Sequence, residues 1–88
     1  MASNDDIKIL VVDDEVAVRE ILVEILSQEG YRLSSAADGG GGLETFRRES
    51  PDIVITDVYM PNMDGLELLA RVRKESPETI SAVMTGFG

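Results

Sequence analysis

Three aspartates that directly follow two short apolar runs are the residues best suited to chemistry. Asp13 and Asp14 come after the run 7–12, and Asp57 comes after the run 53–56. Both runs are rich in β-branched residues and apolar on both faces, which is typical of central strands in a parallel sheet. Sites in open α/β sheets lie at the carboxyl ends of such strands. If the two strands are neighbours, we expect the three carboxylates to converge within a few ångströms of one another.

Carboxylates this close together need compensation. Two of them about 4 Å apart repel by about 4 kcal/mol at an effective dielectric constant of about 20, so one must have a raised pKa or a cation must lie between them. An oxygen-only site that keeps bound waters suits Mg²⁺ or Mn²⁺ better than zinc. Because such a cation lets a dianionic phosphoryl donor approach, Asp57 could become an aspartyl phosphate.

The composition restricts the class of protein. The chain has 88 residues, a formal net charge of −9, and no cysteine or histidine, so carboxylates must carry any ionic chemistry. We expect one domain over residues 1–88. The negative charge opposes direct binding to nucleic acid phosphates. The apolar run 7–12 is far shorter than the about 20 residues of a membrane span. Residues 1–6 lack the features of a secretory signal, so we expect a cytoplasmic protein that does not contact the membrane.

Hydrophobic spacing predicts alternating strands and helices, and hence an α/β fold with a parallel sheet and right-handed crossovers. A helix over 16–28 has apolar residues at helical spacing, and Gly30 follows at the position of a C-terminal cap. The expected elements, in order, are a strand at 7–12, a helix at 16–28, an edge strand at 31–37, a helix after the glycines 39–42, a strand at 53–56, a helix after Asp64 and a strand at 80–84.

The second and third helices carry specific expectations. Each glycine inside a helix costs about 1 kcal/mol relative to alanine, so the helix after the glycines 39–42 should start late or fray. These glycines lack the lysine and hydroxyl residue of a phosphate-binding P-loop. Asp64 has the character of an N-cap with Glu67 in capping-box spacing, and the residues expected on one face of that helix are Leu66, Leu69 and Val72.

Three segments together resemble the receiver domain of two-component response regulators: VVDDE after the first strand, DVYMPNMDG after the third and MTG after the fourth. This resemblance implies a flavodoxin-like (CheY-like) parallel sheet with strand order 2-1-3-4, and Asp57 as the phosphoacceptor. It implies that Asp14 binds Mg²⁺ directly and Asp13 mainly through water, with Asp57 and the Tyr59 backbone carbonyl as further ligands. The roles implied at the end of the chain are a phosphoryl hydrogen bond and switch at Thr85 and a backbone amide at Gly86.

The resemblance also implies partners and a shortened fold. The phosphoryl donor of this family is a phosphohistidine on a sensor histidine kinase or phosphotransfer protein, so the chain is expected to be a substrate more than an enzyme. The family continues into a fourth helix, a fifth strand with a phosphoryl-pairing lysine and a fifth helix, which the 88 residues lack. Phosphorylation should therefore be slow or absent. An apolar face and the edge of the strand at 80–84 should be bare, which favours a homo-oligomer or segment exchange.

Alternatives to a phosphoacceptor differ in how well the sequence fits them. A receiver without phosphotransfer could act as an interaction or self-associating module. A phosphatase with an aspartate nucleophile usually needs a second carboxylate two residues later, where Tyr59 stands. Flavin binding is disfavoured because the first loop is acidic where a phosphate needs donors. An EF-hand is disfavoured because Met60 occupies the position of the first acidic ligand.

Overall fold

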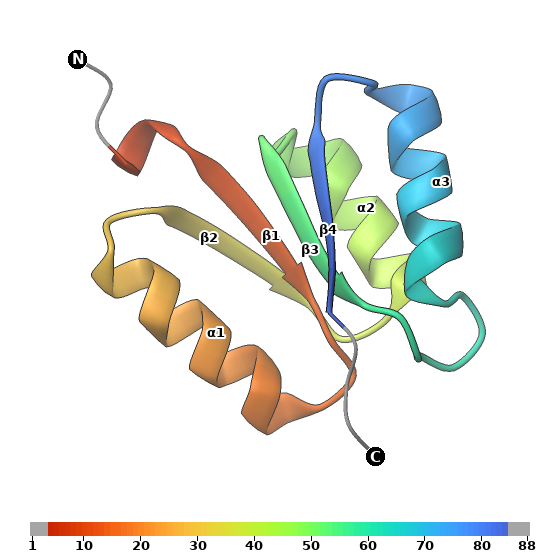
Figure 1. Cartoon of the computed structure of the whole chain (residues 1–88), viewed down its shortest axis with the longest axis horizontal. Helices are drawn as coiled ribbons and strands as arrows, with labels where there is room; N and C mark the ends of the chain where they lie inside the picture. The colour runs from red at the N-terminus through yellow and green to blue at the C-terminus, as the bar shows by residue number, and fades with distance from the viewer. Residues whose placement is uncertain (1–3, 85–88) are drawn as a thin grey trace.

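The computed structural model describes residues 4–84, in which four parallel strands alternate with three α-helices (Figure 1). A short 3-10 helix that the sequence did not predict precedes the first strand. The elements are η1 (Asn4–Asp6), β1 (Lys8–Val12), α1 (Val16–Gln28), β2 (Arg32–Ala36), α2 (Gly39–Glu49), β3 (Ile53–Asp57), α3 (Gly65–Glu75) and β4 (Ile80–Met84). The edge strand is thus shorter than the predicted 31–37, and β1 begins one residue later than predicted. No helix within residues 4–84 is long and apolar enough to cross a bilayer.

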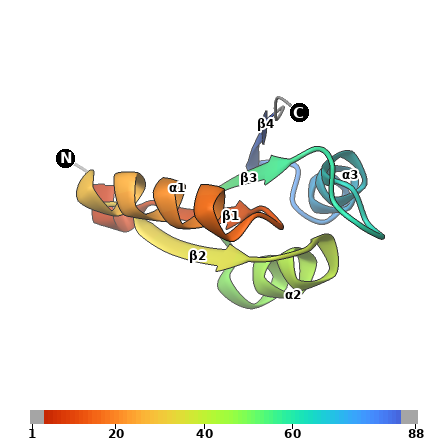
Figure 2. The same cartoon turned by 90° about the horizontal axis from the view of Figure 1, so that it is seen from below.

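The strands pair in the order β2-β1-β3-β4, as predicted. Val12 of β1 is in register with Ala36 of β2 and with Thr56 of β3, and Asp57 is in register with Met84 of β4. Helix α1 lies on one face of the sheet, and α2 and α3 lie on the other (Figure 2). Because all strands are parallel, their carboxyl ends reach the same edge of the sheet, where the predicted site residues follow β1 and β3.

The hydrophobic core lies between the sheet and the pair α2 and α3. Its members are fully or almost fully buried, and burial of each large apolar side chain contributes about 1.5–3 kcal/mol. They are Leu10, Val12, Leu43, Phe46, Val54, Met60, Leu68, Leu69 and Val72. Met60 is in this set and Met63 packs against it, so both methionines of the loop after β3 serve packing. This core anchors the helices whose N-terminal ends border the predicted site.

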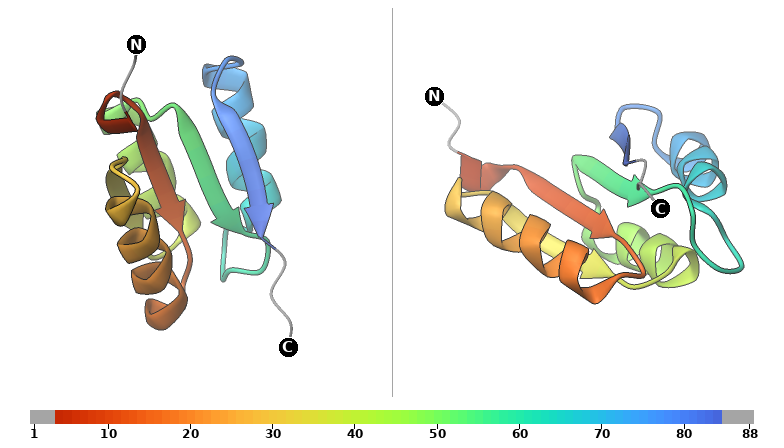
Figure 3. Two further views of the ribbon diagram at one scale, coloured as in Figure 1. Left: turned by 60° about the vertical axis from the view of Figure 1, so that its left-hand side comes forward. Right: turned by 60° about the horizontal axis from the view of Figure 1, so that its bottom comes forward.

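The other face of the sheet is less covered. Helix α1 has no buried residue, and Ile21 and Ile25 are 55% and 53% exposed. Ile80 of β4 is 62% exposed. The left view of Figure 3 shows α1 beside β1, whereas no helix of residues 4–84 lies in front of β3 and β4. This arrangement agrees with the expectation of a bare apolar face and of an unpaired edge at β4 within the described residues.

Helix α2 begins at Gly39, so the prediction of a late start was wrong. The Asp38 side chain caps the helix by accepting a hydrogen bond from the Gly41 amide at 2.6 Å. Gly39 and Gly42 are buried where a larger residue has no space: a Cβ would lie 2.6 Å from the Met63 carbonyl oxygen and 2.9 Å from a Val12 methyl, respectively. Tertiary packing and the cap therefore outweigh the low helix propensity of glycine.

Two predicted caps are confirmed, and one predicted helix face is corrected. The Asp64 carboxylate accepts a hydrogen bond from the Glu67 amide at 2.8 Å, so Asp64 caps α3. Gly30 has a φ of 93° and ends α1, donating its amide hydrogen to Ser27. Leu66, predicted to share one face with Leu69 and Val72, is 59% exposed, whereas those two residues and Leu68 are buried. The buried face of α3 runs through Gly65, Leu68, Leu69 and Val72, which recur at the i, i+3, i+4 and i+7 spacing of one helix face.

Candidate functional site

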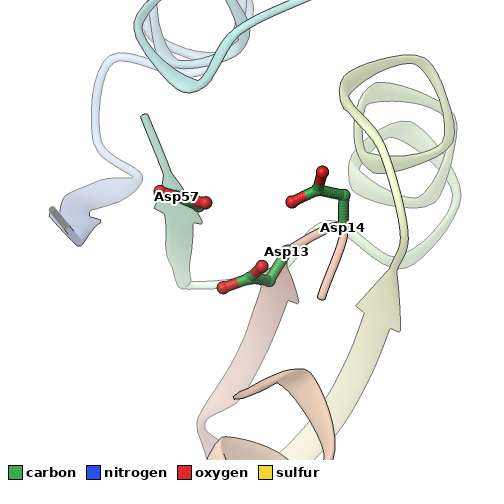
Figure 4. A group of neighbouring side chains, drawn as sticks. All are labelled: Asp13, Asp14 and Asp57. Carbon is green, nitrogen blue, oxygen red and sulfur yellow. The ribbon is translucent and has the colours of Figure 1, made fainter. Parts of the chain in front are cut away.

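The three predicted aspartates converge at the carboxyl edge of the sheet. One carboxylate oxygen each of Asp13, Asp14 and Asp57 lies within 4.8 Å of the other two. Figure 4 shows the side chains facing a common space between the ends of β1 and β3. Asp13 is buried, Asp57 is intermediate and Asp14 is exposed. The expectation that strands β1 and β3 bring these carboxylates together is confirmed.

The turn after β1 is held by three hydrogen bonds to Asp13. Its amide donates to the Ala36 carbonyl at 3.2 Å, which continues the pairing of β1 with β2. The Asp13 carboxylate accepts the Glu15 amide hydrogen at 2.9 Å, and the Asp13 carbonyl accepts a hydrogen from Arg19 Nη1 at 2.7 Å. Asp13 is therefore fixed on both its main chain and its side chain, with one carboxylate oxygen left for a ligand.

Burial raises the pKa of Asp13 above its ordinary value of 3.8. The hydrogen bond from the Glu15 amide opposes this shift, the negative charges of Asp57 and Asp14 add to it, and the Arg19 charge opposes it. The ionised form of Asp13 is thus disfavoured in the folded chain. A bound cation would reverse this preference because it offsets both the burial and the repulsion.

Asp57 ends β3, and the start of α3 packs directly against its backbone. Gly65 is buried there, and only glycine fits, because any Cβ would collide with the Asp57 carbonyl. The Gly65 amide donates to the Val58 carbonyl at 2.9 Å, and the Tyr59 amide donates to Asp57 Oδ1 at 3.3 Å. Glycine at position 65 therefore allows α3 to approach the phosphoacceptor candidate. This role of Gly65 was not predicted, although the Asp-Gly pair at 64–65 was a signal for it.

The other predicted site residues are placed less directly. The Tyr59 residue is 73% exposed, and it contacts Asp57 through its backbone amide. Thr85 and Gly86 lie outside the described residues 4–84. Arg19, which the sequence analysis did not single out, belongs to the site because it binds the Asp13 carbonyl.

Oxygen donors of this kind can hold a hard divalent cation. Three carboxylates from a buried, an intermediate and an exposed residue provide anionic ligands on one side and access for water on the other. Neither of two surface cavities, of about 580 and 740 Å³, includes a residue of the cluster; both are lined by Arg47 and Glu75 near the C-terminal ends of α2 and α3. The cluster is thus an open acidic site rather than part of either cavity.

Comparison with known proteins places the chain in a family. The family model for the response regulator receiver domain matches residues 9–88, and the chain belongs to this family. It is 38% identical over 81 residues to sporulation initiation phosphotransferase F of Bacillus subtilis (strain 168), covering 92% of this chain and 65% of that protein. It is 49% identical over 81 residues to the probable transcriptional regulator ycf27 of Cyanophora paradoxa, covering 92% of this chain and 34% of that protein.

Solved structures show the same fold. The response regulator protein TrrA of Thermotoga maritima, in complex with Mg(2+)-BeF, has a TM-score of 0.88 and 38% identity, covering 93% of this chain and 71% of that chain. A receiver domain protein from Clostridium thermocellum has a TM-score of 0.87 and 33% identity, covering 93% of this chain and 67% of that chain. The flavodoxin-like prediction is confirmed. The fifth strand of this fold is absent from the described residues.

Family membership confirms two expectations drawn from the motifs. The chain is a response regulator receiver of two-component signalling, as the segments VVDDE and DVYMPNMDG indicated. Members of the family accept phosphoryl groups from kinases rather than acting as enzymes. A family of this kind implies a kinase or phosphotransfer protein as partner.

Proposed function

We propose that the chain is the phosphoacceptor module of a cytoplasmic two-component system, in which Asp57 receives a phosphoryl group from the phosphohistidine of a sensor histidine kinase or phosphotransfer protein. The observation that carries the proposal is the convergence of Asp57 with Asp13 and Asp14 within 4.8 Å. A lone aspartate at a strand end would need no such neighbours. Three clustered carboxylates repel one another, and a divalent cation that enters with the phosphoryl group offsets this repulsion.

The chemical step is a transfer between two nucleophiles. A carboxylate oxygen of Asp57 attacks phosphorus, the phosphorus–nitrogen bond of the donor breaks, and the imidazole leaves with the electron pair of that bond. Asp57 Oδ1 accepts the Tyr59 amide hydrogen, which orients the carboxylate. Its half-buried position keeps one side open to a protein donor. The donor ring carries a proton on its other nitrogen, so the products are an aspartyl phosphate and a neutral imidazole.

The chain's own residues fit Mg²⁺, with Mn²⁺ as a substitute. We assign direct binding to Asp14, which is exposed, and water-mediated binding to Asp13, whose carboxylate is buried and already accepts the Glu15 amide. Asp57 and the Tyr59 carbonyl complete the proposed ligands. When bound, the cation neutralises part of the charge of the incoming phosphoryl group. The Mg(2+)-BeF complex of the Thermotoga maritima relative supports Mg²⁺ as the cation.

Roles for the end of the chain extend the proposal. We expect the Thr85 hydroxyl to donate a hydrogen bond to the phosphoryl group and to couple it to an output surface near β4. We expect the backbone amide of Gly86 to lie beside the phosphoryl group. Both residues follow β4, the strand in register with β3 at Asp57 and Met84.

A second function is favoured by the exposed apolar surface. Ile21, Ile25 and Ile80 are each more than half exposed on the face of the sheet that α1 only partly covers. Such a surface favours self-association or segment exchange. In this alternative, residues 1–88 form a partial receiver domain that acts as an interaction module without phosphotransfer.

Phosphorylation with a small acyl phosphate separates the two functions. The 88-residue chain is incubated with acetyl phosphate and Mg²⁺, and its intact mass is measured. The phosphoacceptor proposal expects a single added phosphoryl group that requires Mg²⁺ and is absent in the Asp57→Asn variant. No adduct under any condition would instead support the interaction module.

A further inference from the structure

Arg19 binds the backbone of the aspartate turn rather than a carboxylate. Its Nη1 donates to the Asp13 carbonyl at 2.7 Å, and no salt bridge to it is found within residues 4–84. The residue is partly buried. Its own amide donates to the Glu15 carbonyl at 3.0 Å, so its main chain starts α1 while its side chain reaches back over the turn.

The carbonyl that Arg19 holds belongs to the peptide unit joining Asp13 to Asp14. Because a peptide unit is planar, fixing its carbonyl also fixes the direction of the following N–Cα bond. That bond sets where the Asp14 side chain starts. Asp14 is exposed, and its carboxylate accepts no hydrogen bond from residues 4–84. Arg19 is therefore the contact that orients the exposed ligand of the cluster.

The N-cap residue of α1 does not cap the helix with its side chain. Its N-cap is Glu15, which makes no side-chain capping hydrogen bond, whereas α2 and α3 are capped by aspartates. An arginine in the first turn is also electrostatically misplaced for a helix, since the positive end of the macrodipole lies there. The charge of Arg19 is instead offset by the neighbouring carboxylates.

We propose that Arg19 is a positioning residue, which sets the cation affinity of the cluster by holding the Asp13–Asp14 peptide in the orientation that Asp14 needs to act as a ligand. The proposal rests on the proposed metal-binding function of Asp13, Asp14 and Asp57. It goes further by assigning a residue that contacts neither the cation nor the phosphoryl group.

Two effects of removing Arg19 oppose each other, and their difference makes the proposal testable. Loss of a positive charge near three carboxylates would strengthen cation binding by simple electrostatics. Loss of the hydrogen bond to the turn would weaken it, because Asp14 would have to be ordered at the moment of binding. The positioning role predicts that the second effect is larger.

The test measures Mg²⁺ affinity by isothermal titration calorimetry on the 88-residue chain. Arg19→Met keeps most of the aliphatic stem and removes the donor and the charge. Arg19→Lys keeps the charge but replaces the planar guanidinium donor with an ammonium group. Arg32→Met is the matched control, since Arg32 is an exposed arginine at the opposite end of the sheet, paired with Lys8. We expect Arg19→Met to bind Mg²⁺ about tenfold more weakly, Arg19→Lys to restore part of the affinity and Arg32→Met to match the original chain.

Unchanged or tighter Mg²⁺ binding in Arg19→Met would overturn the positioning role while leaving the metal site intact. Absence of Mg²⁺ binding in the original chain would overturn the metal site and the positioning role with it. Should Arg19→Met fail to give a folded amide spectrum, Arg19→Lys decides the question, because equal affinity in that folded variant, despite its altered hydrogen bond, contradicts the proposal.

Discussion

A carboxylate oxygen of Asp13 lies within 4.8 Å of one of Asp57, although Asp13 follows β1 and Asp57 ends β3. The register of β1 with β3 accounts for this closeness, because Val12 and Thr56, the residues that precede them, are paired. The same pairing leaves the folded chain with a concentration of negative charge that must be compensated. This concentration of charge affects the stability of the fold and the binding of metal ions at the site.

The Asp13→Asn variant should be more stable than the original chain at pH 7 without metal. Asparagine keeps an oxygen that can accept the Glu15 amide hydrogen but removes a buried charge whose pKa burial raises. A raised folded-state pKa means that ionised Asp13 destabilises the folded state above that pKa. The penalty disappears as the pH falls through the folded pKa toward 3.8.

Urea denaturation with a chelator at a series of pH values measures this difference in free energy of unfolding. It should be largest near neutrality and fade in acid. The pKa of Glu75, lowered by its hydrogen bond with Arg47, affects both proteins alike and cancels in the difference. A variant less stable than the original chain at pH 7 would contradict the assignment of repulsion and burial at Asp13.

Magnesium should stabilise the original chain. A ligand that binds the folded state alone raises the free energy of unfolding by about 2.7 kcal/mol at a concentration of about one hundred times its Kd. The Asp14→Asn variant should lose most of this increment, since it removes the most accessible ligand. Glu44→Gln, which removes an exposed charge on α2 instead, should keep it. Thermal unfolding with and without Mg²⁺ gives the comparison, and equal increments in all three chains would rule out a specific site.

Two glycines of α2, Gly40 and Gly42, should respond oppositely to replacement by alanine. At Gly40 the nearest atom to a Cβ is Asp38 Oδ1 at 3.7 Å, so Gly40→Ala should stabilise the chain by about 0.5–1 kcal/mol. At Gly42 a Cβ would lie 2.9 Å from Val12 Cγ2 and 3.3 Å from Leu68 Cδ2, so Gly42→Ala should destabilise by about 1–3 kcal/mol. Thermal denaturation of the pair measures both signs. Similar changes at both positions would show that propensity, not packing, dominates there.

Replacing Gly65 should damage the site through the backbone. A Cβ at this position collides with the Asp57 carbonyl group. Because both carbonyl atoms belong to the backbone, they cannot move away as the end of a flexible side chain could. Gly65→Ala should cost about 1–3 kcal/mol of stability and reduce phosphorylation of Asp57 by acetyl phosphate. Gly40→Ala serves as the control with the same chemical change. Full phosphorylation in Gly65→Ala would show that the approach of α3 does not position Asp57.

The sequence predicted the strands and the carboxylate cluster well because both follow from short-range patterns. The apolar runs before Asp13 and Asp57 indicate buried strands, and parallel pairing brings the ends of neighbouring strands together. The contact of Arg19 with the Asp13 carbonyl has no such pattern, since any long polar side chain near a helix start could reach a backbone oxygen. Only the three-dimensional structure reveals this contact.

The wrong predictions share one physical cause. The expected late start after the glycines 39–42 and the expected common face of Leu66, Leu69 and Val72 were both argued from the residues of one helix alone. In the structure, Gly39 packs against Met63, and Leu68 rather than Leu66 is buried in the core. Contacts between elements decided both positions, and propensity scales do not include them.

A magnesium titration followed by two-dimensional amide NMR tests the central claim most directly, because it reports on each residue of the site at once. The account predicts saturable shifts centred on the amides of Asp13, Asp14, Asp57 and Tyr59, and their loss in Asp14→Asn. Spectra that stay unchanged up to millimolar Mg²⁺, or that shift no more at the strand ends than elsewhere, would contradict a cation site built from these carboxylates.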